Sequence, residues 1–174
     1  LHAFQPLTVE GEEVQSMGWV PISRTHDDEV HFDHNDVFYN QYINLGLRID
    51  TWRFPSQVLK SELDEATRKH LKDRQREKLT RREKEELKIA VSKKLRKKFR
   101  PVTKVIDFSW NIDTATARFW NQSLKNHELL VEQFEKTFPS KLALLSPYTV
   151  ASHAGLPESI LADTASVEAA VLQR

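Results

Sequence analysis

A stretch rich in Lys, Glu, Arg and Leu runs from Ser56 to about Lys98 without a single glycine or proline. This composition strongly favours helix over strand. Ser56 follows Pro55 and is a candidate N-cap, and Thr80-Arg81-Arg82-Glu83 has the spacing of a capping box. We therefore expect two helices, the second beginning near Arg81, that together form an arm projecting from the body of the protein.

The segments on both sides of this stretch alternate as strands do. Tyr42 to Asp50 places Ile43, Leu45, Leu47 and Ile49 on one face. Val102 to Trp110 alternates in the same way, Asn111 to Thr114 has turn composition, and Ala115 to Asn121 is expected to return as the second strand of a hairpin. Glu29 to Phe32 and Val37 to Tyr39 flank residues 33–36, which also have turn composition.

The C-terminal third predicts further elements. The apolar spacing over Asn126 to Phe138 indicates an amphipathic helix, Leu142 to Val150 is expected to form a strand, and Pro157 to Leu172 a last helix. Strands and helices are thus segregated in runs, which favours an α+β fold: antiparallel sheet segments, a basic helical hairpin or arm, and packed C-terminal helices. We expect 174 residues to form one domain, with residues 1–55 β-rich, 56–100 helical, and 101–174 a hairpin plus helices.

The charge of the chain is split in a way that its net charge of +1 conceals. Residues 60–104 carry 18 of the 26 Lys and Arg residues but only 8 of the 25 Asp and Glu residues. They hold a surplus of ten positive charges, and the rest of the chain a surplus of nine negative ones. Residues 93–104 contain no acid at all. A chain that segregates charge in this way is expected to present one strongly positive surface. Such a surface most often binds a polyanion, and nucleic acid is the leading candidate.

At 100° per residue the second helix has two different sides. Leu87, Ala90, Val91, Leu95 and Phe99 form an apolar stripe, and Lys93, Arg96, Lys97 and Arg100 fall opposite to it. Lys and Arg would contact phosphates, which gives affinity without sequence information. The candidate DNA-binding residues are Arg81, Arg82, Lys93, Lys94, Arg96, Lys97, Lys98, Arg100 and Lys104. The alternatives are a solvated surface arm and an arm that docks an acidic protein, such as a recombinase or nuclease that it inhibits.

A second cluster is rich in histidine and aspartate. It contains His26, Asp27, Asp28, His31, Asp33, His34 and Asp36. These residue types can bind a divalent metal, but their spacing matches no known ligand pattern, so we interpret them as a polar hairpin tip. A metal-dependent nuclease built on this cluster remains the less favoured alternative.

Other features point to binding rather than catalysis. Trp19, Trp52, Trp110 and Trp120 could stack on bases, although tryptophans in such strands are more often core. We find no glycine-rich phosphate loop, nucleophile elbow or paired carboxylates, so we predict no enzyme activity, no cofactor and no metal. The absence of cysteine excludes disulfides and fits a cytoplasmic location, and no apolar run approaches the roughly 18 residues that span a bilayer.

The order of segments resembles the RdgC family of recombination-associated, nucleoid-localised DNA-binding proteins. The matching pieces, over residues 1–147, are Ala3-Phe4-Gln5-Pro6, Met17-Gly18-Trp19-Val20-Pro21, Phe54-Pro55-Ser56, the Lys- and Glu-rich helix from Lys78 to Phe99, and the hairpin over Ile106 to Thr114. Where the family tends to read Leu-Pro-Arg-Ala-Phe, this chain has Leu95-Arg96-Lys97-Lys98-Phe99, which is more basic.

The resemblance implies a sequence-independent binder of duplex DNA that forms ring-like dimers and obstructs recombinase filaments. It implies a dimer contact at Phe99, the residue that matches the family's interface phenylalanine. Family members are often labelled exonucleases without a catalytic site that supports the label. They are also longer, so we expect their first strand and helix and their C-terminal half to lie outside this sequence.

Overall fold

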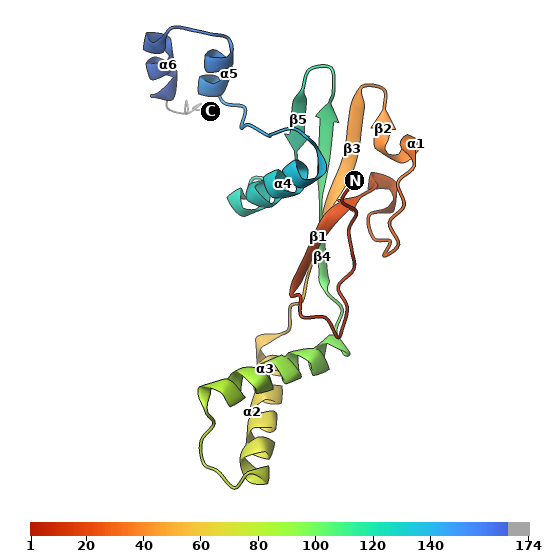
Figure 1. The fold of residues 1–174 in the computed structure, drawn as a ribbon, viewed down its shortest axis with the longest axis vertical. Coiled ribbons are helices and arrows are strands. Elements are labelled where there is room, and N and C mark those ends of the chain that lie inside the picture. Colours follow the sequence, from red (N-terminus) through yellow and green to blue (C-terminus); the bar gives the residue numbers. More distant parts are fainter. Residues whose placement is uncertain (167–174) are drawn as a thin grey trace, which may run out of the picture.

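The computed structural model describes residues 1–166 and consists of one antiparallel sheet, a helix on its face and two helical projections (Figure 1). The five strands are β1 (Gln15–Val20), β2 (Phe38–Tyr39), β3 (Tyr42–Thr51), β4 (Val102–Asn111) and β5 (Thr116–Phe119). Four of them lie in the order β1-β3-β4-β5, and β2 pairs with the first two residues of β3. The helices are η1 (Ile22–Arg24), α1 (His34–Val37), α2 (Ser56–Asp73), α3 (Arg81–Arg96), α4 (Leu124–Thr137), α5 (Pro147–His153) and α6 (Glu158–Ala165). The predicted α+β class is confirmed.

The main core lies between the sheet and α4. Ile43, Leu45, Leu47 and Ile49 are buried on one face of β3, as their alternation predicted. Trp19 of β1 stands opposite Leu47, is fully buried, and donates a hydrogen bond from Nε1 to Thr137 Oγ1 of α4 over 2.8 Å. Leu130 and Phe134 of α4 complete the core. The sheet and α4 therefore form the packed body to which the other elements are attached.

The opposite face of β3 is also covered, by segments from the N-terminus. The chain near Ala3 runs parallel to β1 and forms a bridge to Trp19. Arg48 is buried there, with Asp50 at 2.9 Å and the ring of Phe4 at 4.1 Å. Because β3 is buried on both faces, Arg48 needs this ion pair to satisfy its charge.

The prediction for residues 29–37 was wrong, whereas Phe38 and Tyr39 form strand β2 within the predicted segment Val37 to Tyr39. Residues 29–32 form no strand, and residues 34–37, predicted as a turn, form the single helical turn α1. The hairpin lies further along the chain, where Tyr39 pairs with Tyr42 across Asn40 and Gln41. Asn40 has φ of 52°, a left-handed conformation that asparagine tolerates better than most residues.

The strand predicted over Leu142 to Val150 was also wrong, because residues 141–146 have no regular structure and α5 begins at Pro147. Ser146 and Thr149 form a capping box, and proline occupies the first turn. Both are helix-start signals, so the sequence contained this information. The helix predicted over Pro157 to Leu172 is found as α6, and residues beyond 166 lie outside the described residues.

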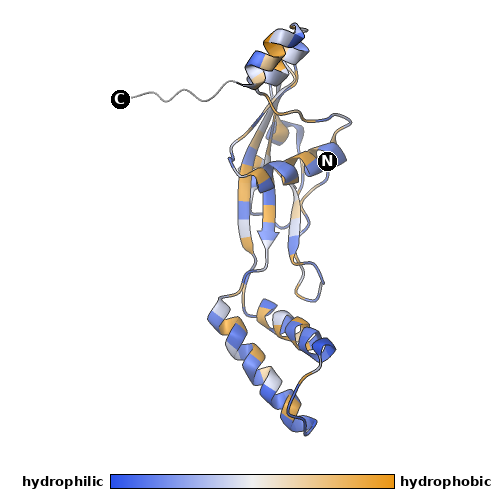
Figure 2. Ribbon diagram, turned by 90° about the vertical axis from the view of Figure 1, so that its left-hand side faces the viewer, coloured by the Kyte–Doolittle hydropathy of each residue, from blue (hydrophilic) through white to orange (hydrophobic). Residues whose placement is uncertain are grey.

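Two helices, α2 and α3, project from the end of the sheet where β3 leaves it and β4 enters it (Figure 1). They pack against each other and are joined by residues 74–80, and we call this pair of helices the arm (residues 56–100). Figure 2 shows that most residues of the arm are hydrophilic, in contrast to the alternating pattern of the sheet. Every helix in residues 1–166 is too short or too polar to cross a lipid bilayer.

Candidate nucleic-acid interface

The arm begins and turns as its sequence predicts. α2 starts at Ser56, directly after Pro55, and α3 starts at Arg81 after the N-cap Thr80. The capping box is complete, since Thr80 Oγ1 accepts from the Glu83 backbone N–H and the Glu83 carboxylate accepts from the Thr80 N–H at 2.9 Å. This fixes the point at which the connection between the two helices ends.

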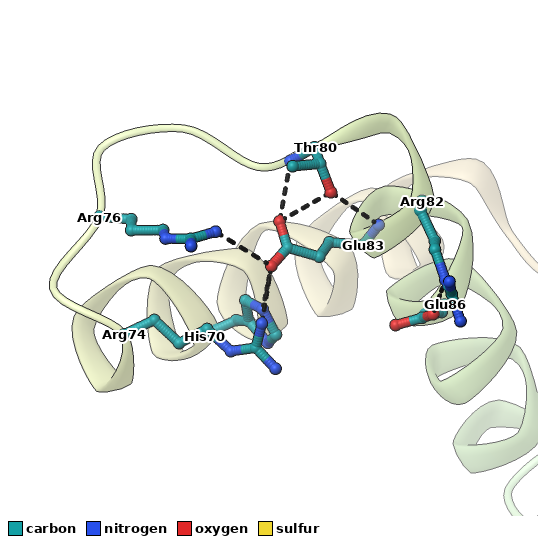
Figure 3. A network of polar contacts seen from close by, with 7 residues as sticks. All are labelled: His70, Arg74, Arg76, Thr80, Arg82, Glu83 and Glu86. Atoms are coloured by element: carbon teal, nitrogen blue, oxygen red, sulfur yellow. Dashed lines mark hydrogen bonds and ion pairs between the residues drawn. The ribbon is translucent and has the colours of Figure 1, made fainter.

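The Glu83 carboxylate also contacts three basic side chains, one from the last turn of α2 and two from the connection that follows it (Figure 3). Its Oε1 lies 2.8 Å from Arg74 Nη1, 3.6 Å from Arg76 Nη1 and 3.5 Å from His70 Nε2. The hydrogen bonds from Thr80, together with His70 and Arg74, lower the pKa of Glu83 to about 2. One carboxylate therefore ties the end of α2 and the connection to the start of α3.

A second carboxylate, Glu62 of α2, binds two of the predicted DNA-contacting lysines. Its oxygens lie 2.6 Å from Lys94 Nζ and 3.0 Å from Lys98 Nζ. The hydrogen bonds from these lysines lower the pKa of Glu62, and Glu62 raises the pKa of Lys94. Lys94 and Lys98 thus have a structural partner, and their charge is partly compensated before any ligand arrives.

The expectation that Arg96 is exposed for contact with DNA was wrong. Arg96 is only 7% exposed, donates a hydrogen bond from Nη1 to the Gly11 carbonyl, and places its guanidinium 5.5 Å from the centre of the Trp52 ring. The cause is tertiary: at the base of the arm, the segment around Gly11 covers the side of α3 that a helical projection assigns to solvent. Arg96 is therefore not displayed with the exposed cations of the arm.

The remaining predicted cations differ in their exposure. Arg81, Arg82, Lys97, Arg100 and Lys104 are exposed, and Lys93 is half-buried. Arg82 pairs with Glu86 at 2.9 Å and Lys97 with Glu10 at 3.3 Å, both between exposed side chains. Exposed pairs of this kind contribute little and open readily, so these cations can still meet a phosphate. Lys97, Arg100 and Lys104 lie close in sequence where the arm joins β4.

The apolar stripe of α3 is narrower than predicted. Val91 and Leu95 are buried and Leu87 is half-buried, but Ala90 is exposed. Phe99 lies just after α3, is half-buried, and packs edge-on against Phe54 at a ring distance of 5.9 Å. Part of its ring therefore remains available for contact with another molecule.

The histidine and aspartate cluster is dispersed in the fold. Asp36 pairs with Arg24, Asp28 lies 3.2 Å from Arg48, and His34 stacks on Phe38. Across residues 1–166, no three His, Asp or Glu side chains are placed to hold one metal ion.

Three of the four tryptophans pack in the interior, as the sequence analysis favoured. Trp19 and Trp52 are buried, and Trp110 packs edge-on against Phe134 and Phe138. Trp120, which directly follows β5, is the exception, because 59% of its surface is exposed. It is the one tryptophan that a base could reach directly in the described part of the chain.

The fold and this surface define a class of protein: an antiparallel α+β body that carries a basic two-helix arm. The chain belongs to the RdgC family, whose family model, described as "Putative exonuclease, RdgC", matches residues 1–155. This confirms the resemblance seen in the order of segments. No curated protein sequence matches the chain.

Proposed function

We propose that this protein binds DNA without sequence preference and acts in DNA recombination or nucleoid organisation by occupying the DNA. The observation that carries the proposal is the exposed group of cations at the root of the arm, Lys97, Arg100 and Lys104, with Arg81 and Arg82 near its tip. Membership of the RdgC family supports it. Exposed Lys and Arg side chains on a projection suit phosphate contacts, which are independent of base sequence.

The proposed role is binding rather than catalysis. The described residues bring together no three candidate metal ligands, and the polar network around Glu83 serves the helix start and the arm connection. Its pKa of about 2 keeps that carboxylate ionised and paired, which does not suit a general acid or base near neutral pH. An obstructing DNA-binding protein in the nucleoid, opposing a recombinase or nuclease, needs no reaction centre.

The protein is also proposed to form a homodimer in which Phe99 lies at a contact. Its half-exposed ring and its position where the arm joins the sheet support this role. Two arms brought together there would present a larger basic surface than one.

The test is a gel-shift titration with duplex and single-stranded probes at several salt concentrations. The five exposed cations predict a linear fall of log K with log salt and a slope of roughly −4 to −5 on duplex DNA, at about −0.9 per phosphate contact. Scrambled probes should bind alike. An affinity that ignores salt, or that depends on one sequence, would contradict phosphate binding by the arm.

Nuclease activity is tested in the same samples. Probes incubated with Mg²⁺ or Mn²⁺ should remain intact. Cleavage that disappears when His31, Asp33 and His34 are replaced together by alanine would instead support the metal-dependent nuclease.

A further inference from the structure

A cleft of about 390 Å³ lies between α3 and the N-terminal segment before β1. The helix contributes Lys88, Ile89, Lys93 and Arg96 to its lining, and the segment contributes Val14. These helix positions follow one another at intervals of one, four and three residues, so they form one continuous strip along α3. The cleft is large enough for a few side chains of a bound peptide.

Arg96 carries a buried charge that no acid neutralises. In residues 1–166 no carboxylate lies within ion-pair distance of its guanidinium. Its Nε has no hydrogen-bond partner, and neither does Nε1 of Trp52, on whose ring the guanidinium lies. The other buried arginine, Arg48, is paired with Asp50. A buried cation without an anionic partner is unfavourable, which indicates that an anion completes the site in a complex.

The rest of the lining indicates which kind of anion this is. Ile89 is 58% and Val14 59% exposed, which is unusual for large apolar side chains that share one cleft. Glu12 and Glu85 also line the cleft, so its three cations (Lys88, Lys93 and Arg96) leave a surplus of one positive charge. That surplus suits a single carboxylate better than the closely spaced phosphates of a DNA backbone. A peptide can place one carboxylate toward Arg96 and Lys93 and an apolar side chain on Ile89 and Val14.

We propose that this cleft is a docking site for an acidic segment of a partner protein, in which a carboxylate adjoins a large apolar side chain. The carboxylate binds near Arg96 and Lys93, and the apolar side chain covers Ile89 and Val14. The site is separate from the exposed cations Lys97, Arg100 and Lys104, so the protein can hold DNA and a protein partner at once. This inference does not depend on the DNA-binding proposal.

The test uses fluorescence polarisation of a labelled octapeptide in which one aspartate adjoins one leucine and the other positions are serine and glycine. We expect saturable binding that weakens with salt. Peptides in which lysine replaces aspartate, or serine replaces leucine, should bind at least about tenfold more weakly, because each lacks one of the two features that the cleft recognises. Equal binding of all three peptides would overturn the proposal, as would no binding of the first.

The variant for this test is Lys88→Ala with Ile89→Ser, two exposed helix positions whose replacement leaves the core intact. It should weaken peptide binding by about tenfold or more. The matched control is Lys125→Ala with Ile112→Ser, which makes the same chemical changes at exposed positions on α4 and at the β4–β5 turn. The control should bind the peptide as the parent does.

A short duplex DNA supplies the last comparison. The Lys88→Ala/Ile89→Ser variant should bind it within about twofold of the parent, since its exposed DNA-contacting cations are unchanged. Full retention of peptide binding by this variant would overturn the docking site. Equal loss of DNA and peptide binding, with DNA displacing the peptide, would also overturn it, because the cleft would then belong to the DNA surface.

Discussion

A methyl group at Gly18 would lie 2.3 Å from the Cα of Phe4 and 2.4 Å from its backbone nitrogen. Backbone atoms cannot move aside as a side chain can, so only glycine lets the N-terminal segment run beside β1. Gly18→Ala should lower the free energy of unfolding by about 1–3 kcal/mol. In a chain of this length each kcal/mol lowers the thermal unfolding midpoint by roughly 2–4 °C. Thermal unfolding followed by tryptophan fluorescence measures it.

The control is Gly155→Ala, where an added methyl group would have no neighbour within 4 Å. Any loss of stability there comes only from the left-handed backbone conformation, with φ of 69°. Gly155 follows α5, away from the sheet (Figure 1). The tryptophan-detected midpoint should therefore stay close to that of the parent. A Gly18→Ala variant as stable as the parent would contradict the close approach.

A second prediction for a single residue concerns Glu83 and the pH dependence of the stability of the arm. Its pKa is lowered from 4.5 to about 2 by Thr80 first, with His70 and Arg74 adding to the effect. A folded-state pKa below the unfolded one contributes stability that is fully present above about pH 4.5 and is lost as the pH falls toward 2. Far-UV circular dichroism should thus show the arm losing helix over this range.

Glu83→Gln should remove that part of the pH dependence, because glutamine does not titrate, and should leave an arm that is less helical at pH 7. Glu86→Gln is the matched control, since Glu86 makes only an exposed i,i+4 pair with Arg82. Its pH profile should follow the parent. Identical profiles for the two variants would show that Glu83 does not secure the arm.

At the scale of an element, the arm separates charges that bind its own acids from charges that face solvent. Lys94 and Lys98 are held by Glu62, whereas Lys97 and Arg100 are exposed. Lys97→Glu/Arg100→Glu should therefore spare the fold. It should weaken DNA binding by roughly tenfold or more and make the salt slope less steep by about 2, because two phosphate contacts are lost and repulsion is added.

The control for this change is Lys125→Glu/Lys141→Glu, which alters the net charge equally at exposed lysines outside the arm. Gel shifts at matched salt compare the two variants, and circular dichroism verifies that both are folded. If both weaken binding alike, net charge alone accounts for the affinity. If the arm variant binds as the parent does, the arm is a solvated or partner-binding surface.

At the scale of the whole molecule, self-association is the property that Phe99 tests. Phe99→Ala should shift sedimentation toward the monomer, because the exposed part of the ring is proposed to contact a second copy. Its half-buried contact with Phe54 means that some stability is lost too, less than the about 3–5 kcal/mol typical of a fully buried phenylalanine.

Phe119→Ala provides the comparison, because Phe119 is also half-buried but packs on the main core and His127. It should lower the unfolding midpoint and leave sedimentation unchanged. Should Phe99→Ala lower the midpoint and leave sedimentation unchanged as well, Phe99 is a core residue and the dimer contact lies elsewhere.

The sequence by itself determined the elements whose signals are local. β3, β4 and the arm helices followed from alternation, from a run without glycine or proline, and from the capping box at Thr80, and each was confirmed. These patterns depend on neighbours a few residues away, so they can be recognised without a fold. The capping box at Ser146 is equally local, but the apolar residues of Leu142 to Val150 favour a strand and compete with that signal.

Only the tertiary structure decided how those elements use their side chains. Arg96 is buried because the segment around Gly11, far away in sequence, covers one side of α3. Glu62 binds Lys94 and Lys98 because α2 folds back along α3, and the histidine and aspartate cluster disperses because Arg24 and Arg48 take its acids. Helical periodicity assigns a residue to a side of its own helix. Whether that side meets solvent depends on packing between distant segments, which local sequence does not encode.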